Sequence, residues 1–362
     1  MYRVSRSRLS LVNNSVAESQ GKVKVKVNDL NLYYEAFGNP SDPPVLLING
    51  LSCQCLQWFP YFYEPIVDSG YYVIRFDNRD VGLSTWIKDK DWEKQPYSLV
   101  DMAKDAVGLL EALGIANAHL IGVSMGGAIA QRIAIDYPDR ILSLTSIVSF
   151  AEASAVGMEG IASFLSAKVP SIEEYLAFWS LLVGTTFPLD VPLYAELYRE
   201  SVEVRQGYNP DCIPRQLRAI ASSSSTLPEL KKIDVPTLIL YGTADPLIPV
   251  AHAVEYAKLI PASQQVKMED VGVKAVFTKF MGYLTRQNFS RSELHEDTLT
   301  QKMLADNIAI VSGVATRFKK DEAGKEVVLE KIGVTYTLHK DKDNQWKIIT
   351  GVNHKPETAI AL

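Results

Sequence analysis

The chain has 362 residues, a length that fits one large domain with a smaller companion as well as two equal domains. Apolar residues make up 47% and charged residues 22%, which excludes a disordered chain, a collagen and a disulfide scaffold. The net charge of −5 gives no basic footprint for nucleic acid, and no apolar run approaches the roughly 20 residues of a membrane helix.

The cysteines and the N-terminal residues bear on the compartment. Cys53, Cys55 and Cys212 are too few for a disulfide framework, so a reducing, cytoplasmic setting is expected. The spacing of Cys53 and Cys55 does not fit a zinc site, and no metal is expected. Residues 1–21 are predicted to be a flexible tail. Their three arginines, with no acid before Glu18, leave an organellar presequence as the alternative.

The next 250 residues alternate between predicted strands and helices. Residues 22–37 alternate apolar and polar side chains, which predicts a β-hairpin with its turn near Asn28 and Asp29. Apolar runs typical of strands buried on both faces of a parallel sheet cover residues 45–50, 71–77, 118–124, 141–150 and 235–242. Helical spacing covers residues 101–114, 125–138 and 251–261, and an edge strand is predicted over 263–272. This order predicts an α/β fold with helices on both faces of the sheet.

Two segments depart from this rhythm. Residues 151–230 carry helical spacing, several prolines and a serine run, which predicts a helical lid. After residue 272, an amphipathic helix over 274–287 precedes β-type stretches over 302–320, 326–340 and 345–354. Consecutive strands with short turns are typical of an antiparallel sheet. We therefore expect a domain over 22–272 and a C-terminal α+β domain over 273–362.

The most specific motif is Gly122-Val-Ser124-Met-Gly126, which fits G-x-S-x-G. It lies after a predicted strand and at the start of a predicted helix, where a tight turn lifts a serine hydroxyl clear of the sheet. Small residues at Gly122 and Gly126 let neighbouring backbone approach, and the helix N-terminus favours negative charge. A glycine-rich turn without catalysis is the alternative, but the context favours Ser124 as a nucleophile.

Two other places supply what acyl transfer by a serine needs. A developing oxyanion requires two backbone N–H donors, for which Met125, directly after the serine, and Leu51, after the Asn-Gly turn, are the candidates. Asp245, just past a predicted buried strand, can orient a histidine and stabilise its charged form. An ordinary turn aspartate is the alternative interpretation of Asp245, and Glu152 is a poorer candidate for the acid.

These elements together resemble the α/β-hydrolase superfamily over residues 24–272. The resemblance is carried by LLING, VIRFDNRDVGLS, HLIGVSMGGAIAQRIA and VPTLILYGTADPLIPV, and it is greatest to carboxylesterases and methylesterases. It implies that Ser124 is the nucleophile, Asp245 the triad acid, and Leu51 and Met125 the oxyanion donors. It further implies a small-molecule ester as substrate and neither metal nor cofactor. Residues 77–79 match a structural loop of the family, so no catalytic role is expected of them.

The triad base is missing from its expected place. In this family the histidine follows the strand after the acid, commonly in a Gly-His step, but here Gly272 is followed by Val273. His119 is expected at the surface, and His252 on a polar helix face. The candidates for a replacement base are His252, His295, His339 and His354. Of these, His295 and His354 are the better candidates, since an appended domain could fold back.

The C-terminal residues have a resemblance of their own. Residues 274–356 resemble the latter part of a SnoaL-like domain of the nuclear transport factor 2 superfamily, a curved antiparallel sheet that is often dimeric. A homodimer through this sheet is one expectation. Two functions stay open: a serine hydrolase of small esters, or a catalytically impaired pseudo-hydrolase or ligand-binding fusion protein. A chimeric chain without a joint function is a third interpretation.

Overall fold

A computed structural model describes most of the chain and divides it into two compact units. The described residues are 23–157, 168–183, 189–243, 245–261 and 263–268, together with four C-terminal strands. One unit extends to Lys267 and the other takes the residues from Met268 onward, together with residues 183–188. No helix in the described part is long and apolar enough to cross a lipid bilayer.

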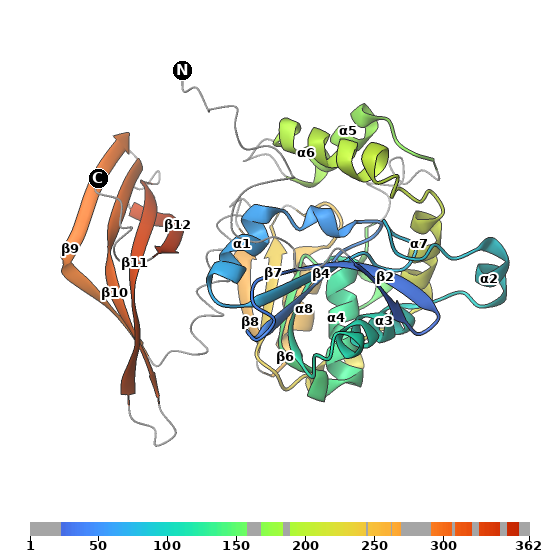
Figure 1. The fold of residues 1–362 in the computed structure, drawn as a ribbon, viewed down its shortest axis with the longest axis horizontal. Helices are drawn as coiled ribbons and strands as arrows, with labels where there is room; N and C mark the ends of the chain where they lie inside the picture. The colour runs from blue at the N-terminus through green and yellow to red at the C-terminus, as the bar shows by residue number, and fades with distance from the viewer. Residues whose placement is uncertain are drawn as a thin grey trace. The chain divides into compact units, whose positions relative to one another are not determined.

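The first unit is built on an eight-stranded sheet with strand order β1-β2-β4-β3-β5-β6-β7-β8 (Figure 1). Its strands are β1 (Val23–Val27), β2 (Leu30–Phe37), β3 (Pro44–Ile48), β4 (Tyr72–Phe76), β5 (Ala118–Val123), β6 (Ile141–Ile147), β7 (Thr237–Gly242) and β8 (Ser263–Met268). Pairing is antiparallel from β1 to β2 and from β2 to β4, and parallel from β4 through β3, β5 and β6 to β7. The predicted parallel sheet and hairpin are therefore confirmed.

Five helices accompany this sheet: α1 (Pro60–Asp68), α2 (Asp89–Lys94), α3 (Leu99–Ala112), α4 (Met125–Asp136) and α8 (Val250–Lys258). Helix α4 packs against β3, β5 and β6 and against α3, so it is buried on nearly all sides. Helix α3 begins with a capping box in which the Ser98 hydroxyl accepts the Asp101 N–H and the Asp101 carboxylate accepts the Ser98 N–H. The short, charged α2 was not expected from the sequence.

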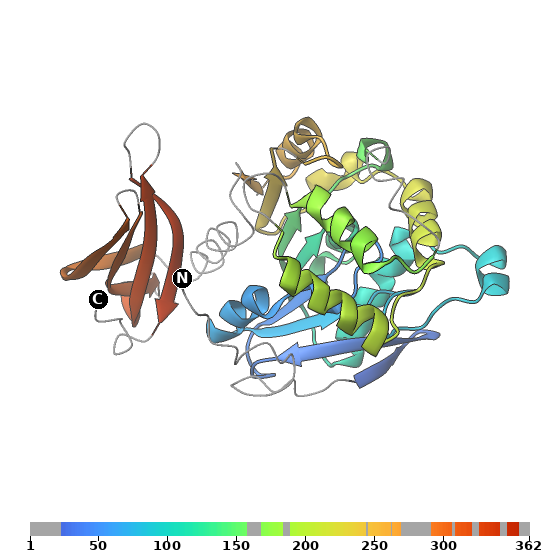
Figure 2. The ribbon, with the colours of Figure 1, turned by 90° about the horizontal axis from the view of Figure 1, so that it is seen from above.

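The predicted helical lid is present as a cap over the sheet. It comprises α5 (Ile172–Leu182), α6 (Val191–Tyr198), the π-helical turn η4 (Arg199–Val204), α7 (Cys212–Ser222) and the 3-10 segment η5 (Leu227–Lys232). Helices α5 and α6 lie side by side (Figures 1 and 2). A second apolar cluster, which includes Phe59, Tyr175 and Leu197, joins them to the loop after β3.

The second unit contains a four-stranded antiparallel sheet with strand order β12-β11-β10-β9. Its strands are β9 (Arg291–Ala305), β10 (Ile308–Lys320), β11 (Glu326–Lys340) and β12 (Trp346–His354). The antiparallel sheet is as predicted, but the single stretch expected over 302–320 was wrong. It contains the end of β9 and all of β10, and β9 starts eleven residues earlier. Charged residues interrupt the apolar alternation of β9, so its own sequence indicates a strand only weakly. Pairing with β10 stabilises β9 as a strand.

The predicted tail over 1–21 and the predicted helix over 274–287 lie outside the described residues.

Candidate active site

Ser124 occupies a strained turn between the end of β5 and the start of α4. Its backbone angles are φ 54° and ψ −123°, a conformation that residues other than glycine rarely adopt. The Ser124 N–H donates to Ile147 O at 2.9 Å, and Ser124 O accepts the N–H groups of Gly127 and Ala128. Strand pairing on one side and the first helical turn on the other therefore hold this serine in place.

The glycines that flank Ser124 are required by close backbone approach. A Cβ at Gly126 would overlap with Ile48 O and lie 2.7 Å from Asn49 O. A Cβ at Gly122 would overlap with Gly126 O and lie 2.6 Å from Gly127 N. The backbone segments can pack this closely only if both residues lack a side chain. Packing therefore requires the two glycines of the G-x-S-x-G motif.

The loop after β3 lies directly against Ser124. A Cβ built on Gly50 would be 3.2 Å from Ser124 Cβ and 3.7 Å from Ser124 Oγ. Leu51 follows Gly50, and Met125 is the first residue of α4. In the part of the chain that the structure describes, neither the Leu51 nor the Met125 N–H donates a hydrogen bond. Met125 is thus adjacent to the serine in sequence, and Leu51 follows the residue that lies against the serine.

Asp245 follows β7 at the same edge of the sheet, because the carboxyl ends of parallel strands meet there. In the strand order, β6 separates β5 from β7, so the two ends are roughly 10 Å apart. Asp245 Oδ1 accepts the N–H groups of Leu247 at 2.8 Å and Ile248 at 3.0 Å. Burial raises the pKa of Asp245, and these two hydrogen bonds oppose the rise. Among the described residues, nothing donates to Oδ2, the oxygen that could orient an imidazole.

Neither histidine of the first unit forms a hydrogen bond with Ser124. The expectation of a polar face for His252 was wrong, and His119 is partly buried. His252 lies on the buried stripe of α8 with Ala253 and Tyr256, and its Nε2 accepts the Ala151 N–H at 3.0 Å. His119 is packed edge-on against Tyr71 and hydrogen-bonded to Ser143, because β5 is a central strand covered on both sides. Burial lowers the pKa of both histidines, which favours their neutral form.

The other three histidines belong to the antiparallel sheet of the second unit. His295 lies in β9, His339 in β11 and His354 in β12. Cross-strand partners connect His295 to Val314 and Gly333 to His354, so these two histidines occupy one row across the four strands.

Two residues beside the serine were not identified from the sequence. Ser149 Oγ donates to Ser124 O at 2.7 Å, and Val148 has φ 42°, which is strained for a β-branched side chain. The sequence feature that could have pointed to Ser149 is Gly127. A Cβ at Gly127 would lie 2.5 Å from Ser149 Oγ, so the glycine leaves room for this side chain.

The alternative acid, Glu152, lines a cavity whose lining residues do not include Ser124. This cavity has a volume of about 300 Å³ and is bordered by α3, α4, the loop after β6 and the end of α7. Its polar lining includes Arg132, Asp136 and Glu229, and its apolar lining includes Leu99 and Phe150.

Comparison with known proteins identifies the family of each part of the chain. A family model described as "alpha/beta hydrolase fold" matches residues 43–280, and one described as "NTF2-like protein (DUF6841)" matches residues 251–356. Rhodomycin D methylesterase DnrP of Streptomyces peucetius is 28% identical over 274 residues, which cover 68% of this chain and 89% of that protein. 3-Oxoadipate enol-lactonase 2 of Acinetobacter baylyi is 25% identical and covers 64% and 82% of the two chains.

Solved structures share the fold of the first unit. The enol-lactonase of Burkholderia xenovorans has a TM-score of 0.61 at 23% identity, and the match covers 73% of this chain and all of that one. A thermophilic esterase of Thermogutta terrifontis has a TM-score of 0.59 at 24% identity, and the match covers 74% and 98% of the two chains. At these identities the likeness establishes the fold alone.

Proposed function

Because the chain belongs to the α/β-hydrolase fold family and is a hydrolase, we propose that it cleaves a carboxylic ester of a small molecule with Ser124 as nucleophile. The observation that supports this proposal best is the turn at Ser124, whose backbone is strained. Gly50, which precedes Leu51, lies against this serine, and Met125 follows it; among the described residues, neither the Leu51 nor the Met125 N–H has an acceptor. An aspartate follows a strand at the same sheet edge. The methylesterase and enol-lactonase relatives are named for ester-type substrates, which supports this reaction class.

The proposed reaction has two steps. Ser124 Oγ bonds to the ester carbonyl carbon as a base removes its proton, and the N–H groups of Leu51 and Met125 bind the resulting oxyanion. The bond to the leaving alcohol then breaks, and the alcohol takes the proton. A water molecule attacks the acyl-serine in the same manner, which releases the acid and restores Ser124. Asp245 would orient the base and stabilise its cationic form.

The base is the weak part of this site. No histidine follows β8 at the family position, and His119 and His252 are held by other contacts. Turnover is therefore expected to be slow unless His295, His339 or His354 supplies the base. In serine proteases, an oxyanion hole and substrate binding without a complete triad retain about 10³–10⁴-fold of catalysis over water.

The test is hydrolysis of p-nitrophenyl acetate and butyrate by the full chain and by Ser124→Ala. We expect the substitution to reduce turnover to the buffer rate, because no other group would form the acyl intermediate. Ser149→Ala is the matched control, since it removes a neighbouring hydroxyl but leaves the nucleophile. Equal rates for the full chain and Ser124→Ala would contradict the proposal.

The absent base favours a second candidate function, a pseudo-hydrolase or ligand-binding fusion that retains the pocket but not the chemistry. A full chain that binds small esters, with no turnover above buffer and no reaction with fluorophosphonates, would support this candidate. We also propose a domain boundary near residue 273, a tail over residues 1–21, a cytoplasmic location and a homodimer that forms through the C-terminal sheet.

A further inference from the structure

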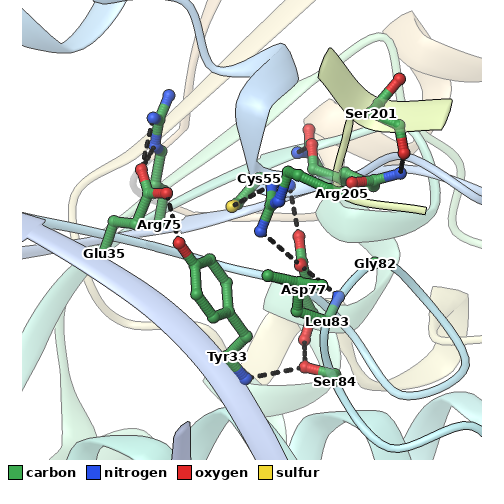
Figure 3. Close-up of polar contacts among 12 residues, drawn as sticks. Tyr33, Glu35, Cys55, Arg75, Asp77, Gly82, Leu83, Ser84, Ser201 and Arg205 are labelled. Atoms are coloured by element: carbon green, nitrogen blue, oxygen red, sulfur yellow. Dashed lines mark hydrogen bonds and ion pairs between the residues drawn. The ribbon is translucent and has the colours of Figure 1, made fainter. Parts of the chain in front are cut away.

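A buried arginine of the cap reaches the sheet beneath it (Figure 3). Arg205 directly follows the π-helical turn η4, and its side chain is only 7% exposed. Its guanidinium lies 4.6 Å from the centre of the Tyr33 ring, and Nη2 is 3.3 Å from Asp77 Oδ2. The proposed reaction has no step for this charge, so its place in the interior needs another explanation.

Asp77 connects this arginine to the loop after β3. The carboxylate is fully buried, and Oδ1 accepts the Cys55 N–H at 2.7 Å, while Oδ2 accepts the Leu83 N–H at 2.9 Å. Burial raises the pKa of Asp77 and Arg205 opposes the rise, so the arginine favours the ionised form that accepts these bonds. A Cβ at Gly82 would overlap with the same carboxylate, so its surroundings are packed to the limit.

Hydrogen bonds within the loop after β3 connect the anchored Cys55 to Gly50, the residue before the proposed oxyanion donor Leu51. The Asn49 side chain donates to Gln54 O at 2.7 Å, next to the anchored Cys55, and the Cys53 N–H donates to Gly50 O at 3.3 Å. Gly50 in turn lies against Ser124. The backbone between these points, which includes Leu51, is therefore held at both ends.

Two more contacts from the cap hold the same loop. The Gln54 side chain donates to Ser201 O in η4 at 3.1 Å. The Ser52 N–H donates to Oε1 of the fully buried Gln216 in α7 at 2.8 Å, and Ser52 has φ 57°, a left-handed conformation that needs such support. The cap thus holds Ser52 and Gln54, the residues that directly follow the proposed donor Leu51.

We propose that Arg205 is a positioning residue for the oxyanion hole: through Asp77 and the Cys55 N–H it sets the direction of the Leu51 N–H beside Ser124. This inference rests on the proposed function. It makes the cap a part of the catalytic apparatus, since displacement of η4 would release the donor. A donor misplaced by about 1 Å costs about 10²-fold in rate, and the transition state loses more than the bound substrate does.

The experiment compares the full chain with Arg205→Met, Arg205→Lys, Asp77→Asn and the double variant Asp77→Asn/Arg205→Met. Arg199→Met is the matched control, because Arg199 begins the π-helical turn that Arg205 follows, but it is half exposed and pairs with Glu196. Hydrogen exchange of the amides in residues 51–57 and the kcat and KM for p-nitrophenyl butyrate are measured for each.

Arg205→Met is expected to speed amide exchange in residues 51–57 and to lower kcat roughly 10–100-fold, with KM within about threefold of the full chain. Arg205→Lys should recover part of both effects, and the double variant should be no worse than the more damaging single variant. If Arg205→Met does not fold, Arg205→Lys carries the test.

Three results would overturn the inference: unchanged amide exchange in the arginine variants, faster exchange with unchanged kcat, or additive effects in the double variant. A full chain without turnover would refute the proposed function instead, while the exchange data would still decide whether Arg205 holds the loop.

Discussion

His119 shows how one partly buried side chain makes folding depend on pH. Its ring packs on Tyr71 and bonds to Ser143, and burial lowers its pKa to about 4, against about 6.5 in an unfolded chain. Above pH 6.5 the histidine is neutral in both states and its full contribution to stability is present. As the pH falls from 6.5 to 4, the unfolded chain binds the proton first, and that contribution is lost.

We therefore predict that His119→Asn flattens the pH dependence of unfolding. Between pH 7 and 5, the full chain should lose up to about 1.4 kcal/mol per pH unit more than the variant, in urea-induced unfolding at each pH. Asn can keep a polar contact with Ser143 and does not titrate. Parallel pH profiles for the two proteins would show that His119 is not responsible.

Single residues could be proposed from the sequence where they belong to a catalytic motif. Residues whose role depends only on tertiary packing could not. Ser124 was recognisable because glycines at fixed spacing surround it. Arg205 was not, because its partner Asp77 is 128 positions away and neither side chain signals the other. His252 was misplaced because a histidine can occupy an apolar helix stripe when its ring finds a backbone donor.

Among the elements, the β5–α4 connection has the tightest steric requirement. In most helices Gly→Ala is favourable by about 0.5–1 kcal/mol, because alanine loses less backbone entropy. Gly126 is different, since its Cβ would overlap with Ile48 O at the end of β3. This carbonyl oxygen belongs to the backbone of a central strand and cannot move aside cheaply.

Gly126→Ala is therefore predicted to destabilise the protein by about 2 kcal/mol or more, as overpacking of a core does. Thermal and urea unfolding measure the change. Gly242→Ala is the matched control, because a Cβ there meets only ordinary contacts of 3.7 Å or more. A Gly126→Ala variant as stable as the control would contradict the packing argument.

The parallel strands could be predicted element by element because each is a short apolar run buried on both faces. Strand β9 could not, because its charged residues conceal the alternation and its partner β10 decides its conformation. The π-helical turn η4 also escaped prediction, since nothing in its composition distinguishes it from the preceding turn of α6.

At the scale of the whole molecule, the two units should be separable. The main apolar core comprises described residues from Val27 to Ile260, and the eight-stranded sheet is complete with β8. A chain shortened to residues 1–272 is therefore predicted to fold, with a cooperative thermal transition. A chain of residues 1–290, which keeps the predicted helix over 274–287, is the control. Aggregation of the shorter chain alone would show that residues 273–290 cover the core of the hydrolase unit.

The central claim is that Ser124 is a nucleophile in a hydrolase site, and the most direct measurement is its reaction with a fluorophosphonate. Peptide mass spectrometry of the treated full chain locates the adduct, with Ser149→Ala and Ser124→Ala treated in parallel. We predict one phosphonylated residue, Ser124, in the full chain and in Ser149→Ala, and none in Ser124→Ala. An unmodified Ser124 after prolonged treatment, or an adduct on another residue that persists in Ser124→Ala, would contradict the claim.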